Sequence, residues 1–142
     1  MTGDLAALQR TLGAEHAAIF VLGALGGRAA TLPAPQLRAA LASAYDAHVL
    51  RRDELRTMVI GTGGDPVAAE PAYRLPSPLS TAAQITAEAL RVERTCVTTY
   101  AALVAASTDD ERRWAVEALA TTAVGEADFG GHPQALPGLG SG

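Results

Sequence analysis

One acidic residue within an apolar helical pattern constrains this chain more than any other feature. Five apolar residues recur at the spacing of a single helix face: Leu5, Leu8, Leu12, Ile19 and Leu22. Glu15 occupies a position on the same face, where the pattern requires an apolar side chain. A carboxylate in a protein core is costly unless it is paired with a cation, protonated or bound to a metal. The rest of the chain therefore has to supply a partner for Glu15.

The composition favours one helical domain. The 142 residues suit a single domain, and 49% of them are hydrophobic while only 4% are aromatic. The net charge of −4 argues against nucleic acid as a partner, because phosphate binding requires a basic surface. The single cysteine, Cys96, excludes an intramolecular disulfide and a cysteine-based zinc site. No apolar run reaches the ~20 residues of a membrane span. We therefore expect a cytoplasmic protein that does not enter a membrane.

Helical periodicity predicts four helices, at about residues 3–26, 35–60, 81–107 and 109–128. The first is expected to end at the Gly26–Gly27 pair. Thr81 with Gln84, and Thr108 with Glu111, have the spacing of capping boxes at the starts of the third and fourth helices.

A long connection separates the two pairs of helices. Residues 62–80 contain four prolines and no helical pattern, and a structureless segment of this length is uncommon unless it spans something. The connections within each pair are short. The sequence therefore predicts an all-α fold with two helical hairpins joined by a long crossover loop, which is the topology of a ferritin-like four-helix bundle. Residues 1–129 would form this bundle, and residues 130–142 an irregular C-terminal tail.

The second half of the first helix is apolar on nearly all sides, over residues 17–22. A helix of this kind is buried on more than one side. Either it is the central helix of the bundle, or its outer face meets another subunit. We expect a homodimer that forms through this helix.

Three residues on the predicted inner faces could form a polar centre. Chain reversal in the first hairpin places His48 opposite Glu15, and Glu93 lies on the inward face of the third helix. A ferritin-like metal site takes a glutamate from each of two helices and a Glu-x-x-His motif from each of the other two. Tyr45 stands three residues before His48, and Ala120 stands three residues after Glu117, so neither motif is complete. The ligand set is therefore degenerate.

This centre has two interpretations. In the first, it is a buried hydrogen-bonded ion network without a cofactor, with two tyrosines as neutral donors; its members are Glu15, His48, Arg52, Glu93, Tyr45 and Tyr100. In the second, Glu15, His48 and Glu93 bind iron or manganese in an oxidoreductase. The incomplete ligand set favours a structural or partner-binding role over catalysis. An unidentified protein partner could use the crossover and the tail as its contact surface.

Four segments of the chain resemble a known family. They are LQRTLGAEHAAIFVLGALG in the first helix, AHVLRRDEL in the second, GGDPVAAEPAYRLP in the crossover and RVERTCVTTYAAL in the third. Together they resemble the actinobacterial ferritin-like family called domain of unknown function 4439. The resemblance implies a ferritin-like bundle and brings no established activity. It places the family's pattern on Glu15, His16, His48, Arg51, Arg52, Glu93, Cys96 and Tyr100.

Overall fold

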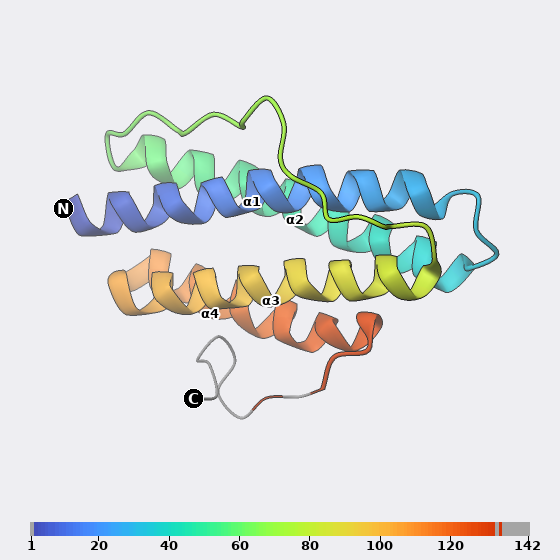
Figure 1. Cartoon of the computed structure of the whole chain (residues 1–142). Coiled ribbons are helices and arrows are strands. Elements are labelled where there is room, and N and C mark those ends of the chain that lie inside the picture. The colour runs from blue at the N-terminus through green and yellow to red at the C-terminus, as the bar shows by residue number, and fades with distance from the viewer. Residues whose placement is uncertain (1, 133, 135–142) are drawn as a thin grey trace.

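The structure, a computed structural model, describes residues 2–132 and 134, which form four α-helices (Figure 1). They are α1 (Thr2–Ala29), α2 (Pro35–Gly61), α3 (Ala82–Ala106) and α4 (Asp109–Gly125), and a short 3-10 helix, η1 (Glu126–Phe129), follows α4 directly. These residues contain no strand. The all-α fold predicted from the sequence is confirmed.

The helices form two antiparallel hairpins. α1 packs against α2 and α3, and α3 packs against α4. The segment between α2 and α3 runs the length of the bundle beside α1, so α3 begins at the end opposite to the one where α2 finishes (Figure 1). This segment is the predicted crossover, and the arrangement of two hairpins joined by it is also confirmed. Most residues of the predicted tail lie outside the described residues.

Local capping chemistry determines the start of α3 but not of α4. Thr81 and Gln84 form the predicted capping box, in which each side chain accepts a hydrogen bond from the backbone of the other. The corresponding prediction for Thr108 is wrong, because its side chain makes no capping bond. The turn between α3 and α4 has only two residues, and Asp109 takes a left-handed backbone conformation with φ of 50° to complete it.

The predicted end of α1 at Gly26 is also wrong, because the helix continues to Ala29. Leu25 and Ala29 are completely buried in the core. Packing of these two side chains favours a further helical turn, and it outweighs the weak helix propensity of the glycine pair.

Two apolar clusters fill the bundle, with a polar layer between them. One lies toward the N-terminal end of α1 and includes Leu8, Leu12, Leu55, Val59 and Leu103. The other lies toward the C-terminal end of α1 and includes Leu22, Leu25, Leu41, Ile85 and Phe129. Glu15 lies between the two clusters along α1, and His48 lies between them along α2; both are completely buried. The polar layer is thus at mid-height in the bundle.

The crossover covers the outer face of α1. Gln9 accepts a hydrogen bond from the Val67 N–H at 2.8 Å, and His16 Nε2 donates to the Val67 carbonyl oxygen at 2.9 Å. Further along, the rings of Phe20 and Tyr73 pack with their centroids 5.4 Å apart. With α2, α3 and the crossover around it, α1 is the central helix. A second subunit is not needed to explain its apolar faces, and the homodimer stays a prediction.

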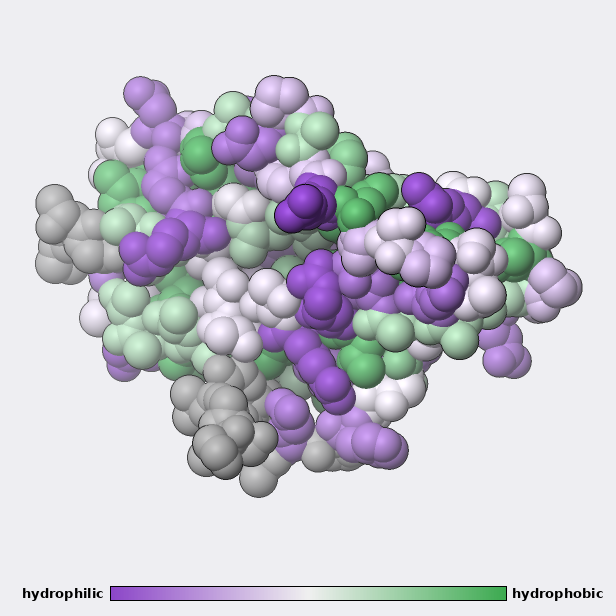
Figure 2. Space-filling model, in the orientation of Figure 1, coloured by the Kyte–Doolittle hydropathy of each residue, from purple (hydrophilic) through white to green (hydrophobic). Residues whose placement is uncertain are grey.

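Hydrophobic and hydrophilic residues are interspersed over the face of the molecule shown in Figure 2. On the face shown in Figure 2, green and purple residues alternate without a continuous apolar band. Among the described residues, none of the helices combines the length and the hydropathy required to cross a membrane.

Candidate functional site

The polar layer is built by one residue from each of three helices. His48 of α2 lies between Glu15 of α1 and Glu93 of α3. Its Nδ1 is 2.5 Å from Glu15 Oε2, and its Nε2 is 2.6 Å from Glu93 Oε1. The side chains of Glu15 and His48 are completely buried and that of Glu93 is 6% exposed. The imidazole ring therefore bridges two carboxylates away from solvent.

This geometry favours the charged form of His48. An imidazole that donates from both nitrogens is an imidazolium, whereas a neutral ring has only one N–H. Burial alone would lower the pKa of His48, but the hydrogen bonds to Glu15 and Glu93 and the charges of the two carboxylates outweigh it. Together they raise the pKa from 6.5 to about 9. At neutral pH the layer therefore contains a cation held between two acidic groups.

Tyr100 of α3 extends the network from the other oxygen of Glu15. Its hydroxyl donates to Glu15 Oε1, and its ring is completely buried. Burial, and then the charge of Glu15, raise the pKa of Tyr100 well above its usual value, so the phenol stays protonated. The ring meets the Trp114 indole edge to face, with the centroids 5.9 Å apart.

Arg51 lies beside Tyr100, on the side of the network that faces the surface. Its Nη1 lies 3.5 Å from the Tyr100 hydroxyl, and its guanidinium carbon lies 5.6 Å from the centre of the Tyr100 ring. A cation over the face of an aromatic ring is attracted to it. Arg51 therefore adds a second positive charge beside a layer that holds two carboxylates and one imidazolium.

The structure brings together four of the six residues predicted for the network, Glu15, His48, Glu93 and Tyr100, and not the other two. Arg52 points away from the layer and pairs with the exposed Asp53 at 3.0 Å. Tyr45 is 37% exposed, and its ring lies beside Gly23 on the surface between α1 and α2. Both assignments are corrected, because these side chains lie at the edge of the α2 face that carries His48.

The structure also places two further residues of the family pattern, Cys96 and His16. Cys96 is buried, and burial followed by the charges of Glu15 and Glu93 raises the pKa of its thiol well above the usual value. A protonated, buried thiol is a poor nucleophile. His16, which follows Glu15 in sequence, points instead toward the crossover.

The three residues predicted as metal ligands do not converge on a common point. Each carboxylate lies against a different ring nitrogen of His48, whereas a metal ion would need one nitrogen and both carboxylates on one side of the ring. Within residues 2–132 and 134, no three His, Cys, Asp or Glu side chains are grouped as metal ligands. The side chains as they lie form an ion network and do not fit a metal.

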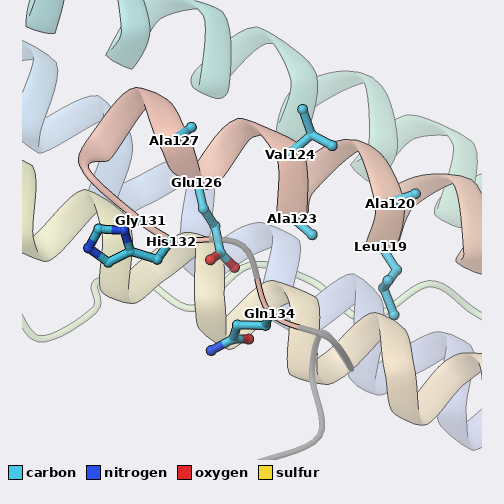
Figure 3. Close-up of a pocket in the computed structure, with 9 residues that line it drawn as sticks. All are labelled: Leu119, Ala120, Ala123, Val124, Glu126, Ala127, Gly131, His132 and Gln134. Atoms are coloured by element: carbon cyan, nitrogen blue, oxygen red, sulfur yellow. The ribbon is translucent and has the colours of Figure 1, made fainter.

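Two hollows lined by α4 are among those that lie outside this network. A cleft of about 270 Å³ between α2 and α4 is lined by both helices and reaches Arg51; the Trp114 indole N–H donates to Glu54 within it. A groove of about 470 Å³ runs along the outer face of α4 and is shown in Figure 3. Neither contains a member of the Glu15–His48–Glu93 layer.

The whole chain can be compared with known proteins. Residues 7–141 match the family described as Domain of unknown function (DUF4439). The chain belongs to this family. A crystal structure of a conserved hypothetical protein, rv2844, from Mycobacterium tuberculosis is similar to this DUF4439 chain, with 32% identity and a TM-score of 0.82. The match covers 91% of this chain and 89% of the mycobacterial one. No curated protein matches the DUF4439 chain. The family resemblance predicted from the sequence is confirmed, and it assigns no activity.

Proposed function

We propose that this DUF4439 protein is a cytoplasmic ferritin-like domain in which the Glu15–His48–Glu93 layer is structural, and which acts by binding a partner rather than by catalysis. The observation that supports this proposal is the use of both ring nitrogens of His48 by carboxylates from two other helices. Such a layer ties α1, α2 and α3 together at one height, because a shift of any helix would leave a buried charge without its partner.

The competing function is a metal-dependent oxidoreductase that uses Glu15, His48 and Glu93 as ligands. It would require His48 to release one carboxylate, so that a nitrogen and both carboxylates face the same ion. The two functions differ in what they predict for the purified protein and for one variant.

The deciding experiment is elemental analysis by mass spectrometry of protein purified without a histidine tag or chelator, before and after incubation with Fe(II) or Mn(II). We expect no stoichiometric metal in either sample. We also expect His48→Ala to lower the free energy of unfolding by roughly 3–5 kcal/mol, because it leaves two buried carboxylates without their cation. Near-stoichiometric iron or manganese that is lost in His48→Ala would overturn the structural assignment.

We also propose that the protein forms a homodimer through α1, with Phe20, which is 37% exposed, as the apolar residue available at the rim of the crossover. Light scattering across protein concentrations measures the oligomeric state directly. A monomer at tens of micromolar would exclude the homodimer, and it would leave the assignment of the polar layer unchanged.

A further inference from the structure

The side of the bundle between α2 and α4 is open. α1 packs closely against α2, and α3 packs closely against α4, whereas α2 and α4 do not pack closely against each other. In the part of the chain that the structure describes, one side-chain hydrogen bond links these two helices, from the Trp114 indole N–H to Glu54 Oε2. Ala47 of α2 and Ala118 of α4 line the cleft of about 270 Å³ at this place. A cleft remains because two alanine side chains are too short to fill the space between the helices.

Three charged side chains line this cleft. Arg51 and Glu54 come from α2, and Glu117 comes from α4. None of the three takes part in an ion pair among the residues that the structure describes. The Arg51 guanidinium is half-buried and held over the Tyr100 ring. Glu54 is held by the indole N–H of Trp114. The cleft therefore presents one positive and two negative groups that do not neutralise one another as ion pairs.

These charges indicate the class of ligand that the cleft can take. A purely anionic ligand on Arg51 would also meet the carboxylates of Glu54 and Glu117, and a purely cationic ligand would meet the guanidinium. A zwitterion satisfies groups of both signs. Its carboxylate can accept two parallel hydrogen bonds from a guanidinium, and its ammonium group has three donors for carboxylates. The cleft is at the small end of the size range of ligand pockets, which suits an amino acid better than a nucleotide.

The remaining lining of the cleft is mostly apolar. The Trp114 ring and Leu50 line it, and Leu50 is 60% exposed. An aliphatic group placed against these two side chains would remove apolar surface from water. The cleft thus combines sites for two opposite charges with an apolar wall.

We propose that the cleft between α2 and α4 binds a small α-amino acid with an apolar side chain, whose carboxylate pairs with Arg51 and whose ammonium group pairs with Glu54 and Glu117. This site goes beyond the structural role proposed for the polar layer and does not depend on it, since no member of the Glu15–His48–Glu93 layer lines the cleft. Metal content decides the role of the layer, whereas ligand titration decides the role of the cleft.

Titration of the full-length protein with L-leucine tests this proposal. Trp114 is the single tryptophan of the chain and lines the cleft, so a change in its fluorescence measures binding there. Two related compounds separate the charges of the ligand: isoamylamine is leucine without the carboxylate, and isocaproate is leucine without the amino group. We expect saturable binding of leucine with a Kd below ~1 mM. Each of the other two compounds should bind at least ~10-fold more weakly, because it lacks one charge-assisted contact.

Three variants assign the contacts to residues. Arg51→Gln and Glu117→Gln each remove one charge from the cleft, and each should raise the Kd for leucine at least ~10-fold. Arg52→Gln is the matched control, because Arg52 pairs with Asp53 and does not line the cleft; it should leave the Kd unchanged. Glu117 is exposed, so Glu117→Gln tests the site even if Arg51→Gln fails to fold.

Methyl NMR locates the bound leucine on the protein. We expect the methyl resonances of Leu50 and Ala118 in the cleft to shift, and that of Ala123 in the outer groove of α4 to stay in place. No saturable response to leucine up to ~10 mM in either measurement would overturn the proposal. Equally tight binding of isoamylamine would also overturn it and would show a site for simple cations. Equally tight binding of isocaproate would overturn it in favour of a site for anions.

Discussion

The charge on His48 predicts how the stability of the protein depends on pH. The pKa of His48 is about 9 in the folded protein and 6.5 in a fully solvated chain. The folded state therefore binds the proton more tightly than the unfolded state. The resulting stabilisation is complete below the unfolded pKa and is lost as the pH rises through the folded pKa. At ~1.4 kcal/mol for each pKa unit, the loss between these two values is about 3 kcal/mol.

The assay is urea unfolding of the wild type and of His48→Gln at about pH 6, 7.5 and 9. Glutamine can donate and accept hydrogen bonds but does not titrate, so the loss of stability assigned to the His48 proton should be absent from the variant. Cys96 titrates with a pKa near 9.0 in the unfolded chain and stays protonated in the folded one, which also lowers stability at high pH. This contribution is common to both proteins and cancels in their difference. Parallel pH profiles for the two proteins would refute the bridging imidazolium.

Three further predictions test other parts of the structure. Arg51→Ala should lower the free energy of unfolding by about 1–2 kcal/mol, because it removes the cation that lies over the buried Tyr100 ring. Arg52→Ala should change the free energy of unfolding by less than ~0.5 kcal/mol, because Arg52 pairs only with the exposed Asp53. Thermal unfolding of the two variants measures both effects. Gly131→Ala should destabilise the protein by about 1–3 kcal/mol, because the added Cβ would overlap Glu126. Gly13→Ala in α1 should stabilise the protein by about 0.5–1 kcal/mol in the same assay, because its Cβ would meet no neighbouring atom and alanine favours a helix. Backbone amides of α4 should exchange with solvent faster than those of α1, since α4 packs closely against α3 alone among the long helices; hydrogen exchange with equal protection in both helices would contradict this.

The polar centre could be largely predicted from the sequence because helical hairpins impose a register. Once the turn between α1 and α2 is located, residues equidistant from it must lie at the same height, which paired Glu15 with His48. Glu93 could be placed on the inward face of α3 by periodicity alone. These three residues meet as an ion network because each occupies the middle of its apolar stripe.

The identity of the arginine in the network could not be predicted in the same way. Arg51 and Arg52 follow His48 by three and four residues, so both lie near the face of α2 that carries it. Which of the two arginines contacts the network depends on the rotation of α2 about its axis and on the position of the Tyr100 ring on α3. Neither quantity is encoded locally in α2. The same rotation places Tyr45 at the surface.

The covering of α1 shows a second limit of sequence reasoning. Apolar residues on all sides of a helix indicate that all sides are covered, but they do not identify the element that covers each side. The crossover covers the outer side of α1, through backbone groups of Val67 that bond to Gln9 and His16. Those contacts are between residues more than fifty positions apart, and the irregular crossover has no periodicity from which they could be predicted.

The closed polar centre is the reason for our proposal that the protein binds a partner rather than acting as a catalyst. Each carboxylate of the layer has an oxygen bonded to His48, and the second oxygen of Glu15 is bonded to Tyr100. A substrate or oxidant would have to displace contacts that hold three helices in register, and the cost of exposing a buried charge opposes that. α4 contributes no residue to the layer itself, and it reaches the network only through Trp114, which packs against the Tyr100 ring. If the protein acts by binding, as we propose, a partner in the cleft toward α2 or in the outer groove would touch no member of the Glu15–His48–Glu93 layer.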